Sequence, residues 1–389
     1  MNDVVSGVAE TCAVRAELER LYDAGLYRQA LAAGEAAWGP VRRWRDLDRR
    51  LLGSRIISQL GLYRTASALV LDSWRREARD ADLVFAYVRT LYNLRGPYPA
   101  RQALLHWQGR VERSAAQQAS WLGLAAVIHG AYRDWEQAHA CVDEAMQLAE
   151  CPEDFLFERA WLYECQDRYD DALATLARIP ATTPNRERYL VQCCSRLLEI
   201  TGQDAQMLDE LRAAFARCES VELGMRLHQK LTDRDLLDEA DACLARLGTL
   251  VPAGEKLVAE EVAIATASLR YRRGDIAGTL AALEPVRGYY FREVRRALAA
   301  ATEDTPRRLL DVPFIRQHHM TCAPATLTAI WRWHGVHIDH LTLAEAICYD
   351  GTSDLAERRW AVQQGWAVRE FELNLDDVCT LIDAGCPVA

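Results

Sequence analysis

A short phrase recurs along most of this 389-residue chain, and its spacing is the strongest constraint on the fold. Gly-Leu-Tyr-Arg at 25–28 returns at 61–64 and, more loosely, as Gly-Pro-Tyr at 96–98. Aromatic residues take the equivalent place at positions 27, 63, 98, 135 and 169, so the steps are 36, 35, 37 and 34 residues. A period of about 35 residues is typical of stacked helix pairs, because one pair alone cannot bury its apolar face. We therefore predict a mainly α-helical solenoid of about eight helix hairpins over residues 1–300.

Later copies of the phrase are more degenerate and begin near 204, 237 and 276. One copy keeps the full order of small, aromatic, turn, aromatic and small residues: Ala160, Tyr163, Asp167, Tyr169 and Ala172. This order resembles tetratricopeptide repeats, in which small residues let paired helices approach and aromatic residues fill the gap between pairs. The resemblance implies that most Tyr and Trp side chains of the copies are core residues. It also implies a concave face that binds a peptide or a helix of a partner protein.

Charged residues on the repeats are the remaining candidates for that face. Arg42, Arg43 and Arg45 form one run, and Glu260 with Glu261 forms another. Such runs are most often solvated helix faces, so they identify no ligand by themselves.

The C-terminal part of the chain contains a candidate nucleophile. Gln317 precedes Cys322 by five residues, and apolar residues recur at helical steps after the cysteine, so we predict a helix that begins at Cys322. Pro324 suits the first turn of such a helix, where its missing N–H costs nothing. A thiolate at a helix N-terminus is favoured by the unpaired N–H groups and by the helix dipole. The Gln317 amide would then donate to the oxyanion that forms when the thiolate attacks a carbonyl carbon.

This segment resembles the start of papain-like cysteine peptidases of the C39-like group, in which V-P is followed by Q-x-x-x-x-C-G-P-A-x-L. Ala323 takes the place of the usual glycine after the cysteine. The resemblance implies the first part of an α+β papain-like (C39-like) domain over 312–389, after a linker over 301–311. Cys322 would be its nucleophile and Gln317 would belong to its oxyanion hole.

The same resemblance implies an extended segment at 312–315, helices near 343–347 and 355–365, and a strand that starts at 385–388. In the C39-like group a histidine and an Asp or Asn follow that strand, whereas no histidine follows His340 here. We therefore expect the protein to continue past Ala389. The alternative is an inactive remnant of the domain.

Other roles for the histidines stay open as weaker alternatives. His318, His334 or a neighbour would serve as the base only if the fold aligned it with the thiol. A zinc site formed by His318, His319 and Cys322 is a further alternative, although the spacing matches no established ligand template.

Composition limits the remaining function classes. The net charge of −10 argues against a general nucleic-acid binder, and arginine supplies 44 of the 46 basic residues beside Lys230 and Lys256. No apolar run reaches membrane-spanning length, and the N-terminal residues lack the pattern of a signal peptide. Twelve scattered cysteines without a secretory signal favour reduced thiols. We expect a cytoplasmic protein without a cofactor or a membrane partner.

Two functions follow from these observations. The first is a C39-like cysteine peptidase, or another thiol enzyme of acyl transfer, whose repeats bind a protein substrate. The alternative is a non-catalytic scaffold for protein–protein interaction with an inactive papain-like remnant.

Overall fold

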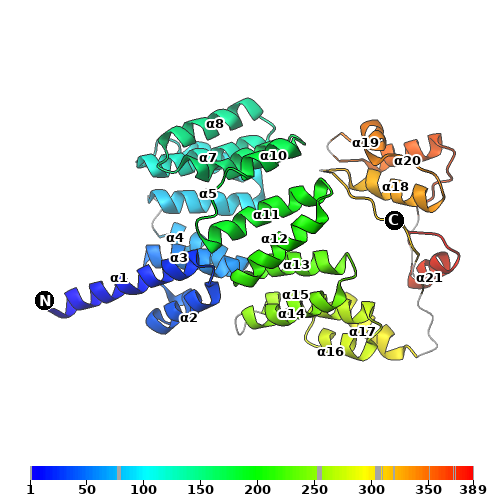
Figure 1. Cartoon of the computed structure of the whole chain (residues 1–389), viewed down its shortest axis with the longest axis horizontal. Helices are drawn as coiled ribbons and strands as arrows, with labels where there is room; N and C mark the ends of the chain where they lie inside the picture. Colours follow the sequence, from blue (N-terminus) through cyan, green and yellow to red (C-terminus); the bar gives the residue numbers. More distant parts are fainter. Residues whose placement is uncertain are drawn as a thin grey trace. The chain divides into compact units, whose positions relative to one another are not determined.

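The computed structural model describes residues 2–76, 80–251, 256–302, 308, 310–318, 320–349, 351–370, 372 and 374–388. They form two compact units, Met1–Ala299 and Ala300–Ala389, and each unit is described by itself (Figure 1). Within the described residues every regular element is a helix, and the only β-type pairing is an isolated bridge between Cys348 and Thr352. None of these helices is long and apolar enough to cross a membrane.

Among its described residues the first unit has eight helix pairs followed by one further helix, in agreement with the predicted number of hairpins. The pairs are α1 (Asn2–Asp23) with α2 (Tyr27–Trp38), α3 (Leu47–Gln59) with α4 (Tyr63–Trp74), α5 (Ala81–Arg95) with α6 (Pro97–Trp107), α7 (Ala115–Ala131) with α8 (Trp135–Leu148), α9 (Leu156–Glu164) with α10 (Tyr169–Leu176), α11 (Pro184–Ile200) with α12 (Asp204–Arg217), α13 (Val221–Thr232) with α14 (Leu237–Leu250), and α15 (Lys256–Arg272) with α16 (Ile276–Leu283). The last helix is α17 (Tyr289–Ala300), and the 3-10 helices η1 (Val41–Arg43) and η2 (Pro152–Phe155) precede α3 and α9. Figure 1 shows the pairs following one another from blue to yellow.

The repeated phrase marks the start of the second helix of each pair. The fourth residue of that helix is small in six of the eight pairs and buried in all eight: Ala30, Ala66, Ala100, Ala138, Ala172, Met207, Ala240 and Thr279. A small side chain at this point lets the two helices of a pair approach closely. The expectation that the aromatic residues are core is wrong for Tyr63 and Tyr98, which are 49% and 65% exposed, whereas Tyr27 is fully buried.

The first helix pair contacts pairs far along the chain, because the hairpin turn between α1 and α2 packs against the sixth and seventh pairs. Leu26, the residue before α2, has no side-chain oxygen to cap that helix. Glu219 does so instead, since its carboxylate accepts from the backbone N–H groups of Arg28 at 2.8 Å and Gln29 at 3.2 Å. A carboxylate at a helix N-terminus satisfies unpaired donors and opposes the positive end of the helix dipole. The Glu219 backbone N–H also donates to the carbonyl of Gly25 at 2.8 Å.

Side chains on both sides of this contact extend it. The Tyr27 hydroxyl donates to Asn185 Oδ1 at 2.7 Å and accepts from Arg188 Nε at 3.0 Å, and burial raises the pKa of this tyrosine. Arg28 Nη1 donates to the carbonyl of Val251 at 3.2 Å, just beyond the end of α14. Contacts between residues so distant in sequence hold the first pair against later pairs of the same unit.

In the part of the second unit that the structure describes there are four helices: α18 (Cys322–Trp333), α19 (His340–Ile347), α20 (Asp354–Gln363) and α21 (Leu375–Asp383). The first begins at Cys322 as predicted, and the next two cover the helices expected near 343–347 and 355–365. Its small core is aromatic, with Trp331 stacked on Trp366 at 5.3 Å and tilted against Trp360 at 4.8 Å.

Two sequence expectations for this unit differ from the structure. Residues 312–315 and 385–388 carry no strand assignment, because no neighbouring strand is present within the described residues to form a ladder. The 385–388 segment instead lies near α18, where the Trp333 indole N–H donates to the carbonyl of Gly385 at 3.1 Å. The helix α21 was not predicted, although Asn374 supplies its N-cap by accepting from the Asp377 N–H.

We predict that Gly25→Ala destabilises the protein more than Gly274→Ala. Each glycine lies in its own hairpin turn between two paired helices, and the two turns share the same hydrogen-bond pattern and have φ of +72° and +77° at the glycine. Alanine therefore costs about 1–2 kcal/mol of backbone strain at either site. A Cβ at 25 would lie 2.7 Å from Cys218 Sγ, whereas a Cβ at 274 meets nothing within 4 Å. Overpacking adds roughly 1–3 kcal/mol at the first site only. Equal losses in urea denaturation of the two variants would contradict the packing of this turn against the end of α12.

Candidate functional site

Cys322 lies where the sequence places it, exposed at the first residue of α18. Thr321, at the N-cap position, does not cap the helix with its side chain. Its hydroxyl accepts instead from the His318 backbone N–H at 2.9 Å and lies 3.1 Å from the His318 carbonyl. The first N–H groups of α18 are therefore left to solvent or to an anion near the thiol.

Within the described residues, none of the other predicted members of this site is hydrogen-bonded to the thiol. Gln317 is exposed in the coil before α18, and within the described residues neither its amide nor the Cys322 thiol makes a hydrogen bond. The rings of His318 and His340 lie 5.3 Å apart, and burial lowers the pKa of His340. His319 falls outside the described residues, and no cluster of three metal-ligating side chains occurs among those that are described.

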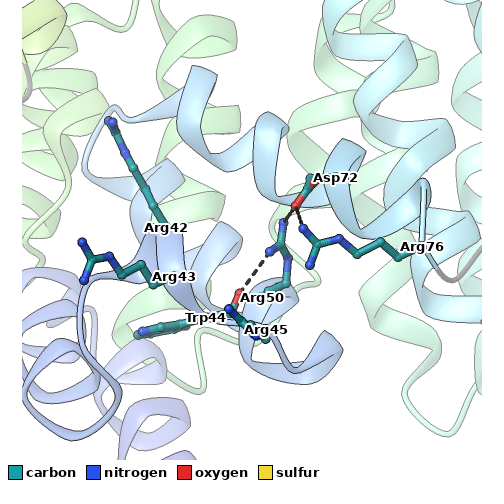
Figure 2. A pocket seen from close by; sticks show the side chains of 7 residues that line it. All are labelled: Arg42, Arg43, Trp44, Arg45, Arg50, Asp72 and Arg76. Atoms are coloured by element: carbon teal, nitrogen blue, oxygen red, sulfur yellow. Dashed lines mark hydrogen bonds and ion pairs between the residues drawn. The ribbon is translucent and has the colours of Figure 1, made fainter.

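A different constellation lies at the second helix pair and the turn before it, and the sequence singled out only its Arg42, Arg43 and Arg45. Two adjoining cavities of about 490 and 380 Å³ share Arg42, Arg50 and Asp72 in their linings. The larger is also lined by Arg43, Trp44, Arg45 and Arg76, and the smaller by Arg64, Thr65, Ala68 and Leu69. We call these two cavities the arginine pocket (Figure 2). Six arginines and one aspartate line it, in a chain whose net charge is −10.

Arg50 holds the pocket together and is not available to a ligand. It is 5% exposed and donates from Nε to Ser73 Oγ at 2.7 Å and from Nη1 to the Trp44 carbonyl at 3.0 Å. Its Nη2 donates to the Leu69 carbonyl at 3.1 Å and to Asp72 Oδ2 at 2.7 Å. The buried guanidinium thus fastens the segment before α3 to the last turns of α4.

Trp44 fixes the same segment from the other side. Its ring is 2% exposed and fits a space kept open by two glycines, since a Cβ at Gly34 or Gly53 would come within 2.7 or 2.8 Å of it. The indole N–H donates to the Gly39 carbonyl at 2.8 Å, and the ring meets Trp38 edge-on at 5.1 Å. Anchoring this one residue places the flanking arginines at the surface.

The charges of the pocket are unevenly compensated. Asp72 accepts from both Arg50 and Arg76, the latter at 3.0 Å, and Figure 2 shows the two guanidinium groups approaching it from different sides. Arg42 donates to Thr65 Oγ1 at 3.2 Å. Within the described part of the chain, Arg43 and Arg45 make no side-chain hydrogen bond or ion pair. Among the residues that line the pocket, exposed arginines therefore face a single carboxylate, that of Asp72.

Sequence reasoning found part of this pocket without recognising it. The run at 42, 43 and 45 was visible, but a charged run is normally a solvated face. Asp72 lies in α4 and Arg76 just after its end, and only the packing of α4 against the turn brings them close to this run. A buried arginine such as Arg50 has no sequence signature, because burial is decided by tertiary contacts.

Comparison with known proteins adds little to this description. No protein-family model matches the sequence, and no curated protein matches it. Among solved structures, the crystal structure of a tetratricopeptide repeat protein from Parabacteroides merdae is similar at a TM-score of 0.36 and 11% sequence identity. That similarity covers 65% of this chain and 98% of the other. The helix pairs and the pocket described above do not depend on it.

We predict that Arg50→Met costs about 2–4 kcal/mol of unfolding free energy, because it leaves the Trp44 carbonyl without the guanidinium donor and Asp72 without its buried partner. The matched change Arg76→Met removes an exposed partner of the same aspartate and should cost less than about 1 kcal/mol. Urea denaturation of the two variants measures both values. A loss at Arg50 no larger than the loss at Arg76 would show that the buried guanidinium does not fasten the two segments.

Proposed function

We propose that this protein acts through its helical repeats as a scaffold that binds another protein. The observation that supports this most is how the apolar side chains of the first unit are used. They are buried within and between consecutive helix pairs, in clusters that extend over several pairs. The surface that remains is extended and carries single exposed aromatic side chains such as Tyr98 and Tyr189. Such a surface suits recognition of a polypeptide more than capture of a small molecule in an enclosed apolar cavity.

The row of first helices is the face on which we propose that a partner lies. Consecutive first helices contact one another, as α5 does with α7 and α7 with α9, which is the arrangement of an inner row. Tyr189 on α11 is 43% exposed in this row and contacts Phe157 on α9 at 4.5 Å between ring centroids. Half-exposed aromatic side chains are common anchors of protein interfaces.

The Tyr189 anchor lies beside ionisable groups. Glu158 lies on α9 next to Phe157 in sequence, and burial raises the pKa of its carboxyl to about 7. The nearby positive charge of Arg89 lowers the same pKa. A partner that covered this face would contact Tyr189, which lies close to a buried carboxyl whose charge depends on pH near neutrality.

Photo-crosslinking tests the scaffold directly. A benzoylphenylalanine in place of Tyr189 is expected to give one discrete protein adduct in extracts of the source cells. The matched control replaces Tyr98, which is 65% exposed on the second helix α6, and is expected to give none. The adduct should persist in a Cys322→Ser background, because scaffolding needs no thiol. The absence of any discrete adduct at 189, or its loss with Cys322, would contradict a scaffold.

We propose a thiol enzyme of the C39-like type as the second candidate, with Cys322 as nucleophile and Gln317 in the oxyanion hole. What favours it is the exposed thiol at the first residue of α18, next to backbone N–H groups that no side chain caps. A residue that accepts the proton is needed as well, and it would have to come from a histidine brought close to the thiol.

We expect iodoacetamide to alkylate Cys322 about threefold faster than Cys379 near neutral pH, because a helix N-terminus stabilises an anion by up to about 1 kcal/mol. Cys379 is the matched thiol, since it is also exposed but lies inside α21. Peptide mapping after brief labelling gives both rates. Equal rates would remove the observation on which the enzymatic candidate depends.

A further inference from the structure

We propose that the arginine pocket is a docking site for an acidic segment of a partner protein, one that carries several carboxylates next to an aliphatic side chain. This rests on the proposed scaffold function and adds a second contact to it. Apart from the buried Arg50 of α3, the residues that line the pocket come from the turn 41–45, from α4 and from Arg76 just after α4.

The first argument is that the positive charge is held in place before any ligand arrives. Trp44 is buried between glycines and Arg50 donates to its carbonyl, so the backbone that carries Arg43 and Arg45 is fixed on both sides. Binding then has to order only the ends of these side chains. Pre-ordered groups lose less entropy on binding, which favours affinity.

The second argument concerns the kind of anion. Guanidinium groups pair with carboxylates through two parallel N–H donors, which gives both direction and strength. Figure 2 shows Arg42 and Arg43 extending away from the Asp72 cluster, so the charges are spread along a surface and do not converge on one point. Spread charges suit carboxylates that are spaced along a peptide better than they suit one compact anion.

The third argument comes from the smaller cavity. Ala68 and Leu69 line it beside Arg64 and Thr65, so it offers an apolar wall within reach of positive charge. An acidic segment with a leucine or valine among its carboxylates would place the aliphatic side chain on this wall. A uniformly charged polymer has no group to bury there.

The immediate surroundings also argue against a nucleic acid. Asp46 and Asp48 directly follow the turn and are exposed, and the chain as a whole is acidic. A phosphodiester backbone that continued past the pocket would run over these carboxylates. A short acidic peptide can end before it reaches them, and the local positive field would attract it despite the negative net charge.

The test uses the full chain and a fluorescein-labelled peptide of glutamates and aspartates with two leucines, read by fluorescence anisotropy. We expect saturable binding that weakens as salt rises from 50 to 300 mM, as charge recognition requires. The same peptide with glutamines and asparagines in place of its acids should not bind. The charge-reversal variant Arg43→Glu/Arg45→Glu should weaken binding by at least about tenfold, since it replaces two attractions by two repulsions.

A matched control separates the pocket from the overall charge of the protein. Arg178→Glu/Arg287→Glu makes the same change in net charge at two exposed arginines outside helices in the same unit. It should alter the affinity by less than about threefold. Unchanged melting temperatures of both double variants show that neither change unfolds the protein.

Several results would overturn the proposal. They are binding weaker than about 1 mM by the wild type, equal loss in the two double variants, equal binding of the neutral peptide, or tighter binding of a ten-nucleotide single-stranded DNA than of the acidic peptide. The scaffold function is judged separately by the adduct at 189. If the adduct at 189 forms in the otherwise unchanged protein and the acidic peptide does not bind to the wild type, the scaffold function stands and only the docking role of the arginine pocket is wrong.

Discussion

The carboxylate of Glu219 on the first N–H groups of α2 is the interaction on which the shape of the first unit depends most. A helix that starts after Leu26 has no capping side chain of its own, so its open N–H groups need an acceptor from elsewhere. The acceptor comes from 191 residues further along the chain. In return Arg28 donates to a carbonyl near the end of α14, where a cation opposes the negative end of that helix dipole. The N-terminus of α2 and the C-terminus of α14 thus each bind a charged side chain from a distant part of the unit.

The repeat architecture was predictable because each copy of the repeated phrase lies within one short segment of the chain. The phrase that includes Tyr27 and Ala30 fixes where a second helix begins and where the two helices cross, and the same positions recur in every pair. The contact of Gly25 with Cys218 was not predictable in this way. It depends on the curvature that accumulates over several pairs, and small rotations between neighbours leave no mark in the period. The aromatic positions show the same limit, since Tyr27 is buried by this contact while Tyr98 has no such neighbour and stays exposed.

The two candidate sites also differ in how much of each can be predicted from local sequence. The helix start at Cys322 follows from apolar periodicity and a proline in the first turn, both readable in one segment. A working thiol site also needs a base and an oxyanion donor placed by distant segments, and these placements cannot be read from spacing. The arginine pocket needs even more, because Arg50 becomes a buried anchor only once Ser73 and Asp72 of α4 face it. Sequence shows which charges exist, whereas packing decides which of them are neutralised and which are left exposed.

The contacts between the first two helix pairs and later pairs also affect the arginine pocket. In an open repeat array each pair touches only its neighbours, so the terminal pairs have the fewest contacts and open most readily. The pocket belongs to the second pair, close to such an end. Here that pair is held by later ones, since Gly61 faces Val258 and the Tyr63 hydroxyl lies 3.3 Å from a carboxylate oxygen of Glu222. Local opening of the second pair must break these contacts as well as those with its neighbours. The arginines of the pocket are therefore presented from a part of the stack that is more firmly held than its place in the sequence implies, and a binding surface benefits from that rigidity.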